Sequence, residues 1–405
     1  MESELFAGLF LRAGWSLSPT AAGADLLLLN TCAFIAPAVE ESLEAVAAAE
    51  RWKMHRKGRA LVLAGCLPGR FSDDGSGGLE IFDLVVRPGE LGRLAEFLGL
   101  PDAVTGQARI GTPPSRYLRI ADGCSNRCAF CTIPGIRGPF RPERSSLIYG
   151  QADALVSAGA REVGLVAQDS GAWSDSGMDV CDLLETLSTS HPDVLWRLYY
   201  IHPSHFPSRL TELFASRPNV APWVDLPLQH ASGGILRRMG RGYDRSTLER
   251  ITAGLDAAPF PIALRATVIA GYPGETEEDF EELRGFLCST DSLRSLVVFP
   301  YSSEEGTLQA DRGDMQVPEE LTAERVAILG LAGESAAWRW AGLLQDREIA
   351  VVSDTERFGH SVYDAPEVDG TCTFTSRVEP GLLIRCRVVE AMGLDMRVSP
   401  ASAGN

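Results

Sequence analysis

Hydrophobic and polar positions alternate along the first hundred residues in the order typical of a small parallel sheet covered by helices. Apolar side chains at helical spacing predict helices, and short continuous apolar runs predict buried strands. Pro37 fits the start of the second helix, because proline is tolerated in a first helical turn. This order predicts an N-terminal parallel α/β domain over residues 1–107. The expected helices lie within 5–10 and 40–50, and the expected strands are 24–29, 60–64 and 81–86.

The middle of the chain repeats the alternation of strand and helix six times. This pattern predicts a partial (β/α)6 barrel over residues 116–340, and active sites of such barrels lie at the carboxyl ends of the strands. The expected strands are 117–121, 163–167, 196–201, 223–228, 263–270 and 296–301. Polar clusters fall at several of these ends, namely Gln168-Asp169-Ser170, His202-Pro203-Ser204, Gln229-His230 and Gly271–Glu275.

Two further segments complete the outline of the chain. Prolines and glycines, including Pro101, Pro113 and Pro114, predict a linker over residues 101–115. Beyond residue 341, short apolar runs around turns predict a small β-barrel that ends at residue 401. Its expected strands are 349–352, 372–374, 382–389 and 396–398. The sequence therefore indicates an α/β multidomain protein of three parts.

Composition and charge narrow the possible functions. The 405 residues are 45% hydrophobic with a formal net charge of −17, which argues against intrinsic disorder and against non-specific binding to nucleic acid. The acidic start, Met1–Glu4, is unlike a secretion signal, and no apolar run approaches the ~20 residues of a membrane span. We therefore expect a cytoplasmic protein without a membrane partner. The acidity favours a basic partner.

Nine cysteines, an odd number in a long chain, favour reduced thiols that bind metal or do chemistry over a disulfide scaffold. Three of them, Cys124, Cys128 and Cys131, are spaced C-x3-C-x2-C in a glycine-led loop after an expected strand. Such thiolates can hold three irons of a 4Fe-4S cluster and leave the fourth iron open. A structural zinc site is the alternative, but zinc prefers four closed ligands and no fourth Cys or His stands nearby.

Cys32 and Cys66 fall just past the ends of two expected parallel strands, where ligands of open α/β sheets bind. Taken alone, the two thiols are equally compatible with small buried hydrophobic side chains. The Gly271–Glu275 segment is also ambiguous. Thr276 and the acidic residues after it would make an ordinary connection from a strand to a helix as well.

The cysteine loop resembles the radical S-adenosylmethionine (SAM) motif, and further segments narrow the resemblance to the methylthiotransferase family. The resemblance implies a Rossmann-like N-terminal domain with a second 4Fe-4S cluster, a TIM-type radical-SAM barrel and a C-terminal TRAM barrel. The matching segments are Asn30-Thr31-Cys32, Gly65-Cys66, the cysteine loop with residues 133–138, residues 227–232 and Gly271–Glu275.

The resemblance also implies roles for individual residues. Cys124, Cys128 and Cys131 would hold the cluster at which SAM, reduced by an electron donor, yields a radical that removes hydrogen from the substrate. The second cluster, with Cys32 and Cys66 as ligands, would present the methylthio group. Gln229 and His230 could face the cofactor or the substrate, and His230 could equally be a structural hydrogen-bonding residue. The implied cofactor-binding residues are Phe130, Gln168, Asp169, Gln229, His230, Arg265, Gly271 and Glu275.

The methylthiotransferase family divides by substrate. One group modifies an adenosine of transfer RNA, and the other modifies the β-carbon of an aspartate in small-subunit ribosomal protein S-twelve. Residues 364–370, residues 301–307 and the acidic terminal barrel are similar to the second group. Between Asp346 and Pro400 the barrel has ten acidic and six basic residues, a net charge of −4, whereas an RNA-binding barrel should be basic. We therefore expect the basic protein S-twelve as partner, with transfer RNA as the alternative.

The sequence departs from the family at its start. Family members begin with a strand ending in Leu-Gly-Cys, which is missing here, so two of three ligands of the second cluster are recognisable. Either the true start lies upstream of Met1, which we prefer, or the second cluster is incomplete. An incomplete cluster would fit a non-catalytic, ribosome-associated protein that binds SAM. The missing strand would expose an edge of the N-terminal sheet. The remaining cysteines, Cys181, Cys288, Cys372 and Cys386, are expected to be structural.

Overall fold

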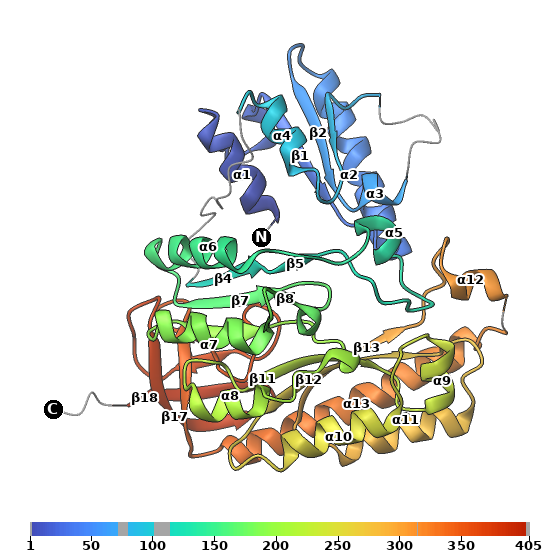
Figure 1. Ribbon diagram of the computed structural model, residues 1–405, viewed down its shortest axis with the longest axis vertical. Helices are drawn as coiled ribbons and strands as arrows, with labels where there is room; N and C mark the ends of the chain where they lie inside the picture. Colours follow the sequence, from blue (N-terminus) through green and yellow to red (C-terminus); the bar gives the residue numbers. More distant parts are fainter. Residues whose placement is uncertain (1, 72–79, 101–113, 314, 402–405) are drawn as a thin grey trace. The chain divides into compact units, whose positions relative to one another are not determined.

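A computed structural model describes residues 2–71, 80–100, 114–313 and 315–401 (Figure 1). The linker predicted over residues 101–115 lies outside the described residues except at its last two positions. The chain forms two compact units, each considered by itself. The first unit contains residues 1–112, 122–141 and 302–311, and the second contains residues 113–121, 142–301 and 312–405.

The N-terminal part of the first unit is a parallel sheet between two layers of helices. Its strands β1 (Leu26–Thr31), β2 (Ala60–Gly65) and β3 (Leu84–Val86) pair in the order β1-β2-β3. Alternate residues of β2 face opposite layers. Leu61 and Leu63 pack with α2 (Ala36–Met54) and α3 (Leu67–Arg70), while Val62 and Ala64 pack with α1 (Glu2–Arg12) and α4 (Leu91–Phe97). The predicted α/β domain is therefore confirmed.

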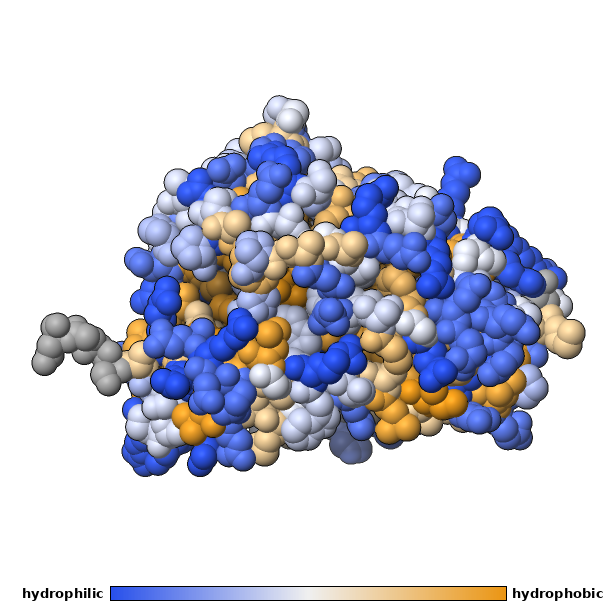
Figure 2. Space-filling view, turned by 90° about the horizontal axis from the view of Figure 1, so that it is seen from below, coloured by the Kyte–Doolittle hydropathy of each residue, from blue (hydrophilic) through white to orange (hydrophobic). Residues whose placement is uncertain are grey.

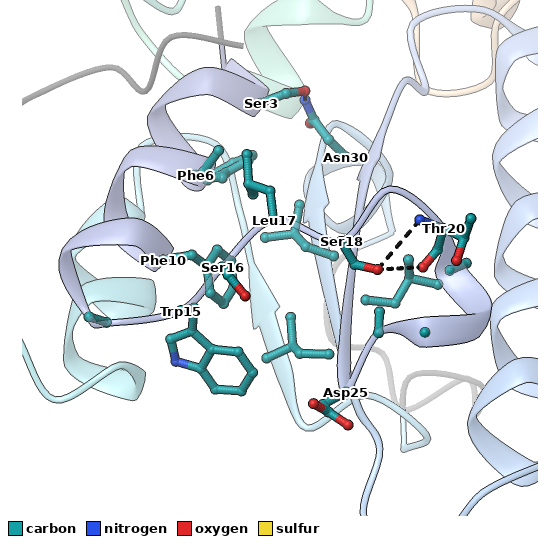
Figure 3. A pocket seen from close by; sticks show the side chains of 18 of the residues that line it. Ser3, Phe6, Phe10, Trp15, Ser16, Leu17, Ser18, Thr20, Asp25 and Asn30 are labelled. Atoms are coloured by element: carbon teal, nitrogen blue, oxygen red, sulfur yellow. Dashed lines mark hydrogen bonds between the residues drawn. The ribbon is translucent and has the colours of Figure 1, made fainter. Parts of the chain in front are cut away.

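β1 is an edge strand of this sheet, as expected, and pairs only with β2 among the described strands. Its outer side borders a cavity of about 780 Å³. Phe6 and Phe10 of α1 and Leu17 of the following segment line this cavity (Figure 3). On another side of this cavity, the hydroxyl of Ser18 donates a hydrogen bond to the carbonyl of Thr20 and accepts one from its N–H. The remaining short elements of the first unit are η1 (Ala21–Gly23) and α5 (Ile133–Arg137); α12 (Leu308–Arg312) begins in it.

Six parallel strands of the second unit form two three-stranded sheets. β4 (Ser115–Arg119), β7 (Glu162–Val166) and β10 (Leu195–Leu198) pair in the order β10-β7-β4. β11 (Trp223–Gln229), β12 (Ala263–Ala270) and β13 (Leu293–Pro300) pair in the order β11-β12-β13. An isolated parallel bridge pairs Trp196 of β10 with Val220, just before β11. All six strands predicted for the partial barrel are therefore confirmed.

Helices alternate with these strands, and α13 packs along β13 and beside α11 (Figure 1). Figure 2 shows hydrophobic residues interspersed among hydrophilic ones on one face of the molecule. Among the hydrophobic side chains of α13, Leu331 and Trp338 are largely exposed. None of the described helices is long and apolar enough to cross a membrane. The helices are α6 (Ser145–Ser157), α7 (Val180–Ser190), α8 (Leu210–Ser216), α9 (Gly233–Arg238), α10 (Arg245–Asp256), α11 (Glu277–Ser289) and α13 (Glu319–Leu344). Shorter elements are η2 (Ser170–Ala172), η3 (Pro203–His205), β5 (Ala121–Asp122), β6 (Arg141–Pro142), β8 (Ser174–Asp175) and β9 (Met178–Asp179).

The C-terminal strands of the second unit close into a small barrel in the order β14-β15-β16-β18-β17. Four of the five were predicted, and β15 was not. The barrel core is continuous with that of the parallel sheets, because Trp223 and Trp340 pack in the same cluster as Val351 and Phe374. The strands are β14 (Glu348–Ser353), β15 (Phe358–Ser361), β16 (Cys372–Phe374), β17 (Leu383–Met392) and β18 (Asp395–Pro400).

Candidate functional site

Cys124, Cys128 and Cys131 lie together in one loop of the first unit. Gly123 opens the loop with φ of 75°, and a Cβ there would lie 2.2 Å from the carbonyl oxygen of Pro139, so only glycine fits. The backbone N–H of Cys124 donates to the carbonyl of Gly138 at 3.1 Å, and that of Cys131 donates to the carbonyl of Cys128 at 3.1 Å. The loop is therefore held by its own backbone.

The donor set of this loop is three thiols within eight residues. A structural zinc ion prefers four closed ligands, whereas three thiolates can hold three irons of a 4Fe-4S cluster and leave the fourth iron open. The three thiols therefore remain the predicted ligands of such a cluster. Phe130 lies in the same loop and is partly buried.

A cavity of about 400 Å³ lies beside the triad loop, and Cys128 and Cys131 line it together with Arg70, Arg127 and Glu305. None of the last three was predicted as a site residue, although Arg127 lies inside the cysteine motif and Glu305 inside the 301–307 segment. The cavity wall formed by residues 302–311 is fixed to the triad loop by a hydrogen bond from the N–H of Gln309 to the carbonyl of Ala129 at 2.8 Å.

Glu304 anchors the same wall from inside the first unit. Its buried carboxylate lies 2.8 Å from Nη2 of Arg70 and accepts a hydrogen bond from the N–H of Ala36 at 2.9 Å. Ser302 donates a third hydrogen bond at 2.7 Å. The segment 301–307, which sequence analysis linked to the substrate group, thus has at its centre a carboxylate that positions one wall of the triad cavity.

Cys32 and Cys66 lie where they were predicted, at the carboxyl ends of adjacent parallel strands. The N–H of Cys66 donates to the carbonyl of Thr31 at 2.8 Å. Burial raises the pKa of the Cys66 thiol, while Arg137, whose Nη2 lies 3.5 Å from the sulfur, opposes that shift. Arg137 is oriented by Glu2 at 2.9 Å. A guanidinium in this position would stabilise a thiolate ligand of a metal centre.

The four remaining cysteines lie in α7, α11, β16 and β17, as expected. Burial raises the pKa of Cys181 to about 12 and that of Cys386 to about 11, and it raises the pKa of Cys372 as well. Buried thiols of this kind stay protonated and act as small apolar side chains. Cys288 is exposed on α11.

In the second unit, buried polar atoms without partners gather at the carboxyl ends of the barrel strands. The side-chain oxygens of Gln168, after β7, and Gln229, at the end of β11, have no hydrogen-bond partner among the described residues. Nε2 of His202 has none either, whereas Nε2 of His230, without a hydrogen bond, lies 3.5 Å from the carboxylate of Glu275. Gln229 also adopts φ of 64°, a conformation that costs free energy outside glycine. Because buried polar atoms are normally satisfied, this edge has the character of a ligand site.

The turn at Gly271–Glu275 is fixed by the carboxylate of Glu275. This buried group accepts hydrogen bonds from the N–H groups of Gly271 at 3.0 Å and Tyr272 at 3.3 Å, and it pairs with Arg325 at 2.8 Å. A Cβ at Gly271 would lie 2.3 Å from the side chain of Thr322. Gly271 and Glu275 therefore shape the turn after β12, and the carboxylate oxygens of Glu275 accept from groups within the chain.

Arg265, an implied cofactor contact, lies near the amino end of β12, and its guanidinium pairs with Asp225 at 3.2 Å and with Asp369 at 3.3 Å. Asp364 is likewise buried, in a pair with Arg294. Asp364 and Asp369 of the 364–370 segment therefore connect the terminal barrel to the parallel sheets instead of facing solvent, because Asp364 pairs with the buried Arg294 and Asp369 with the partly buried Arg265.

Comparison with known proteins agrees with this arrangement. The profile of the Radical SAM superfamily matches residues 118–287, and that of the uncharacterized protein family UPF0004 matches residues 1–86. A protein of Desulforudis audaxviator (strain MP104C) named ribosomal protein uS12 methylthiotransferase RimO is 35% identical, over 98% of this chain and 93% of that protein. A protein of the same name from Moorella thermoacetica (strain ATCC 39073 / JCM 9320) is 36% identical, over 91% of this chain and 89% of that protein.

Two solved structures support the fold alone. The radical SAM methyltransferase TsrM from Kitasatospora setae, with cobalamin and a 4Fe-4S cluster bound, has a TM-score of 0.52 at 16% identity and covers 73% of this chain and 66% of its own. The cobalamin-dependent SAM radical enzyme OxsB has a TM-score of 0.52 at 12% identity, over 82% and 53%. Together with the near-full-length relatives, these findings show that the chain belongs to the RimO family of radical-SAM methylthiotransferases.

Proposed function

We propose that this enzyme replaces a C–H bond by a C–SCH3 bond at the β-carbon of an aspartate in ribosomal protein uS12, the protein S-twelve of the small subunit. One observation carries the proposal: a relative named ribosomal protein uS12 methylthiotransferase RimO matches 98% of the chain at 35% identity. The two family profiles, over residues 1–86 and 118–287, cover both strand-end cysteines, the triad loop and the polar edge of the barrel.

Cys124, Cys128 and Cys131 hold a 4Fe-4S cluster, and the fourth iron is left to SAM. When bound, the cluster and SAM together supply a carbon radical that removes the hydrogen atom from the substrate. The buried oxygens of Gln168 and Gln229 accept hydrogen bonds from amino or hydroxyl groups of SAM, which satisfies both. Glu275 and Gly271 hold the neighbouring turn, and Phe130 contributes apolar contact in the triad loop.

Cys32 and Cys66 supply two thiolates to a second 4Fe-4S cluster, which carries the sulfur to be transferred. Their positions at one edge of adjacent strands support this role, as does the positive charge of Arg137 beside Cys66. Charge supports a protein substrate over transfer RNA. The chain carries −17 and would attract a basic ribosomal protein. Action on uS12 would place the enzyme in the cytoplasm, with a one-electron donor as a further partner.

The proposal is tested with the full chain reconstituted anaerobically with iron and sulfide and incubated with SAM, dithionite and purified uS12. Mass spectrometry should find one methylthio group on an aspartate, and none with the Cys128→Ala variant. A parallel incubation with bulk transfer RNA tests the alternative. Methylthiolated adenosine in its digest, with uS12 unchanged, would replace the proposed substrate, and SAM binding without modification of either would indicate a non-catalytic protein.

A further inference from the structure

A cluster of one carboxylate and two imidazoles lies beyond the ends of β7 and β10 in the second unit. Oδ2 of Asp169 lies 2.7 Å from Nδ1 of His205, and Oδ1 of Asp169 accepts a hydrogen bond from the N–H of His202 at 3.4 Å. Asp169 and His202 are buried, whereas the side chain of His205 is 41% exposed. The cluster is therefore open to solvent on the side of His205 only.

The backbone around these residues leaves the two rings little freedom. A Cβ at Gly171 in η2 would lie 2.3 Å from the carbonyl oxygen of His205, so the two short helical turns η2 and η3 are in close backbone contact. The N–H of Ser170 also donates to the carbonyl of Tyr200 at 3.0 Å. Groups held this rigidly are preorganised to bind a ligand.

The tautomer of His202 decides what the cluster can bind. Nδ1 of His202 accepts a hydrogen bond from the N–H of Ser204 at 3.2 Å, so the ring proton of neutral His202 is on Nε2. That Nε2 is buried without a hydrogen-bond partner among the described residues. A protonated ring nitrogen has no lone pair for a metal ion. Although the ligand atoms are close enough for a metal, the ring presents a donor, and the missing partner is an acceptor.

Positive charge near the His202 ring favours an acceptor that carries negative charge. Burial, Arg241 and His205 together lower the pKa of His202 to about 2, so the ring stays neutral and keeps its Nε2 proton. Arg241 is itself buried, with Nη2 donating to the carbonyl of Pro227 at 2.8 Å. A buried guanidinium and an unpaired N–H donor favour an anion over a neutral acceptor.

We propose that Asp169, His202 and His205 form a carboxylate-binding site. Nε2–H of His202 donates to one oxygen of the ligand. His205, oriented by Asp169 through Nδ1, donates to the other oxygen from Nε2 when its ring is protonated. This inference rests on the proposed function, which brings two carboxylates to the enzyme: the side chain of the target aspartate and the methionine carboxylate of SAM. Asp169 is then a positioning residue, which acts through His205.

The test compares two variants that differ by charge alone. His202→Asn and His202→Asp both keep a side-chain oxygen to accept from Ser204, but only the second places a negative charge in the site. The reconstituted full-length enzyme is titrated with SAM and with two uS12-derived peptides, one containing the target aspartate and one containing asparagine in its place. His191→Gln is the matched control, since His191 makes a comparable pair with Asp153, at 2.9 Å, elsewhere in this unit.

The aspartate peptide should bind about tenfold or more weakly to His202→Asp than to His202→Asn, because hydrogen bonds to charged groups contribute this much. The asparagine peptide should not distinguish the two variants. A matching loss of SAM affinity instead would identify the methionine carboxylate as the ligand. His205→Gln should lower the affinity for the same ligand, and His191→Gln should bind all three probes with the affinity of the wild type.

Equal affinities of both His202 variants for all three probes would overturn the inference, as would stoichiometric zinc or iron retained by His202→Asp and lost from His202→Asn. Thermal melting of each variant separates these results from a folding defect. The proposed function is judged separately, since it fails if wild-type enzyme leaves uS12 unmodified. The carboxylate site fails if wild-type enzyme modifies uS12 while the charge of residue 202 has no effect on binding.

Discussion

Nη2 of Arg294 lies 2.7 Å from the carboxylate of Asp364, and both side chains are almost completely buried between the terminal barrel and β13. Arg294 also donates to the carbonyl of Leu394 at 3.0 Å. Removing one partner leaves an uncompensated buried charge. Asp364→Ala should therefore lower the free energy of unfolding by about 3–5 kcal/mol, measured by denaturant titration.

The double variant Arg294→Met/Asp364→Leu should recover most of that loss, because two apolar side chains replace the buried pair. The KM for uS12 should not change in Asp364→Ala protein that remains folded. A variant of unchanged stability with a raised KM would show instead that residues 364–370 contact the substrate.

His360 should make stability depend on pH. Burial opposes its charge, but Glu162 outweighs burial and raises the pKa of His360 to about 9. Because the folded pKa lies above the unfolded value, this contribution is complete below about pH 6.5 and is lost as the pH rises through 9. Wild-type protein should lose on the order of 3 kcal/mol of stability across this interval.

His360→Gln should abolish that alkaline loss and be less stable than wild type at pH 6. At the acid end, burial raises the pKa of Glu162, but Arg197 and His360 outweigh burial and lower it to about 2. The contribution of Glu162 is therefore present above about pH 4.5 and lost as the pH falls through 2. Parallel pH profiles of the wild type and His360→Gln between pH 6.5 and 9 would refute the assignment.

Glu304 and Glu305 are neighbours with opposite environments, so they form a natural pair of variants. Glu304→Ala removes the partner of Arg70 and the acceptor of the Ala36 N–H, and it should cost about 3 kcal/mol, measured by thermal or denaturant unfolding. Glu305 is exposed, and Glu305→Ala should change stability by no more than about 0.5 kcal/mol. Equal effects of the two substitutions would mean that Glu304 does not anchor the cavity wall.

Iron content should separate the cysteines by role. Cys124→Ala should remove about four irons per chain from reconstituted protein, since each cube holds four. Cys181→Ala, at a buried structural thiol, should retain the iron content of the wild type. The Cys32→Ser/Cys66→Ser double variant should lose whatever iron is bound outside the triad, and an unchanged count would exclude a second cluster at these residues.

The sequence predicted strands best where they are buried on both faces. The run that became most of β7, residues 163–167, is continuously apolar, and those of β11 and β12 are mostly apolar, with Asp225 and Arg265 as the charged exceptions; that pattern is local. β15 escaped prediction because Phe358-Gly359-His360-Ser361 shows no alternation. Its buried His360 is stabilised by Glu162, which lies 198 residues earlier in the chain.

The residues of the candidate site were likewise predictable only where their signal lies within a short stretch of the chain. The triad was predictable because its spacing is contained within eight residues of one loop. The inward orientation of Asp364 and Asp369 was not predictable, because their arginine partners lie 70 and 104 residues earlier. Asp169 and His205 are 36 residues apart, and neither a fixed spacing nor a motif joins them. Pairings that depend on the meeting of two strand ends become visible only in three dimensions.

The outer side of β1, which pairs with no strand in the described ranges, affects how the protein behaves at high concentration. Backbone donors and acceptors along an edge strand are a template on which another extended segment can add. The adjoining cavity, lined by Phe6 and Phe10, adds apolar surface to that template. Aggregation during expression and storage should therefore begin at this edge, and a soluble peptide that pairs with β1 would act as an inhibitor of aggregation.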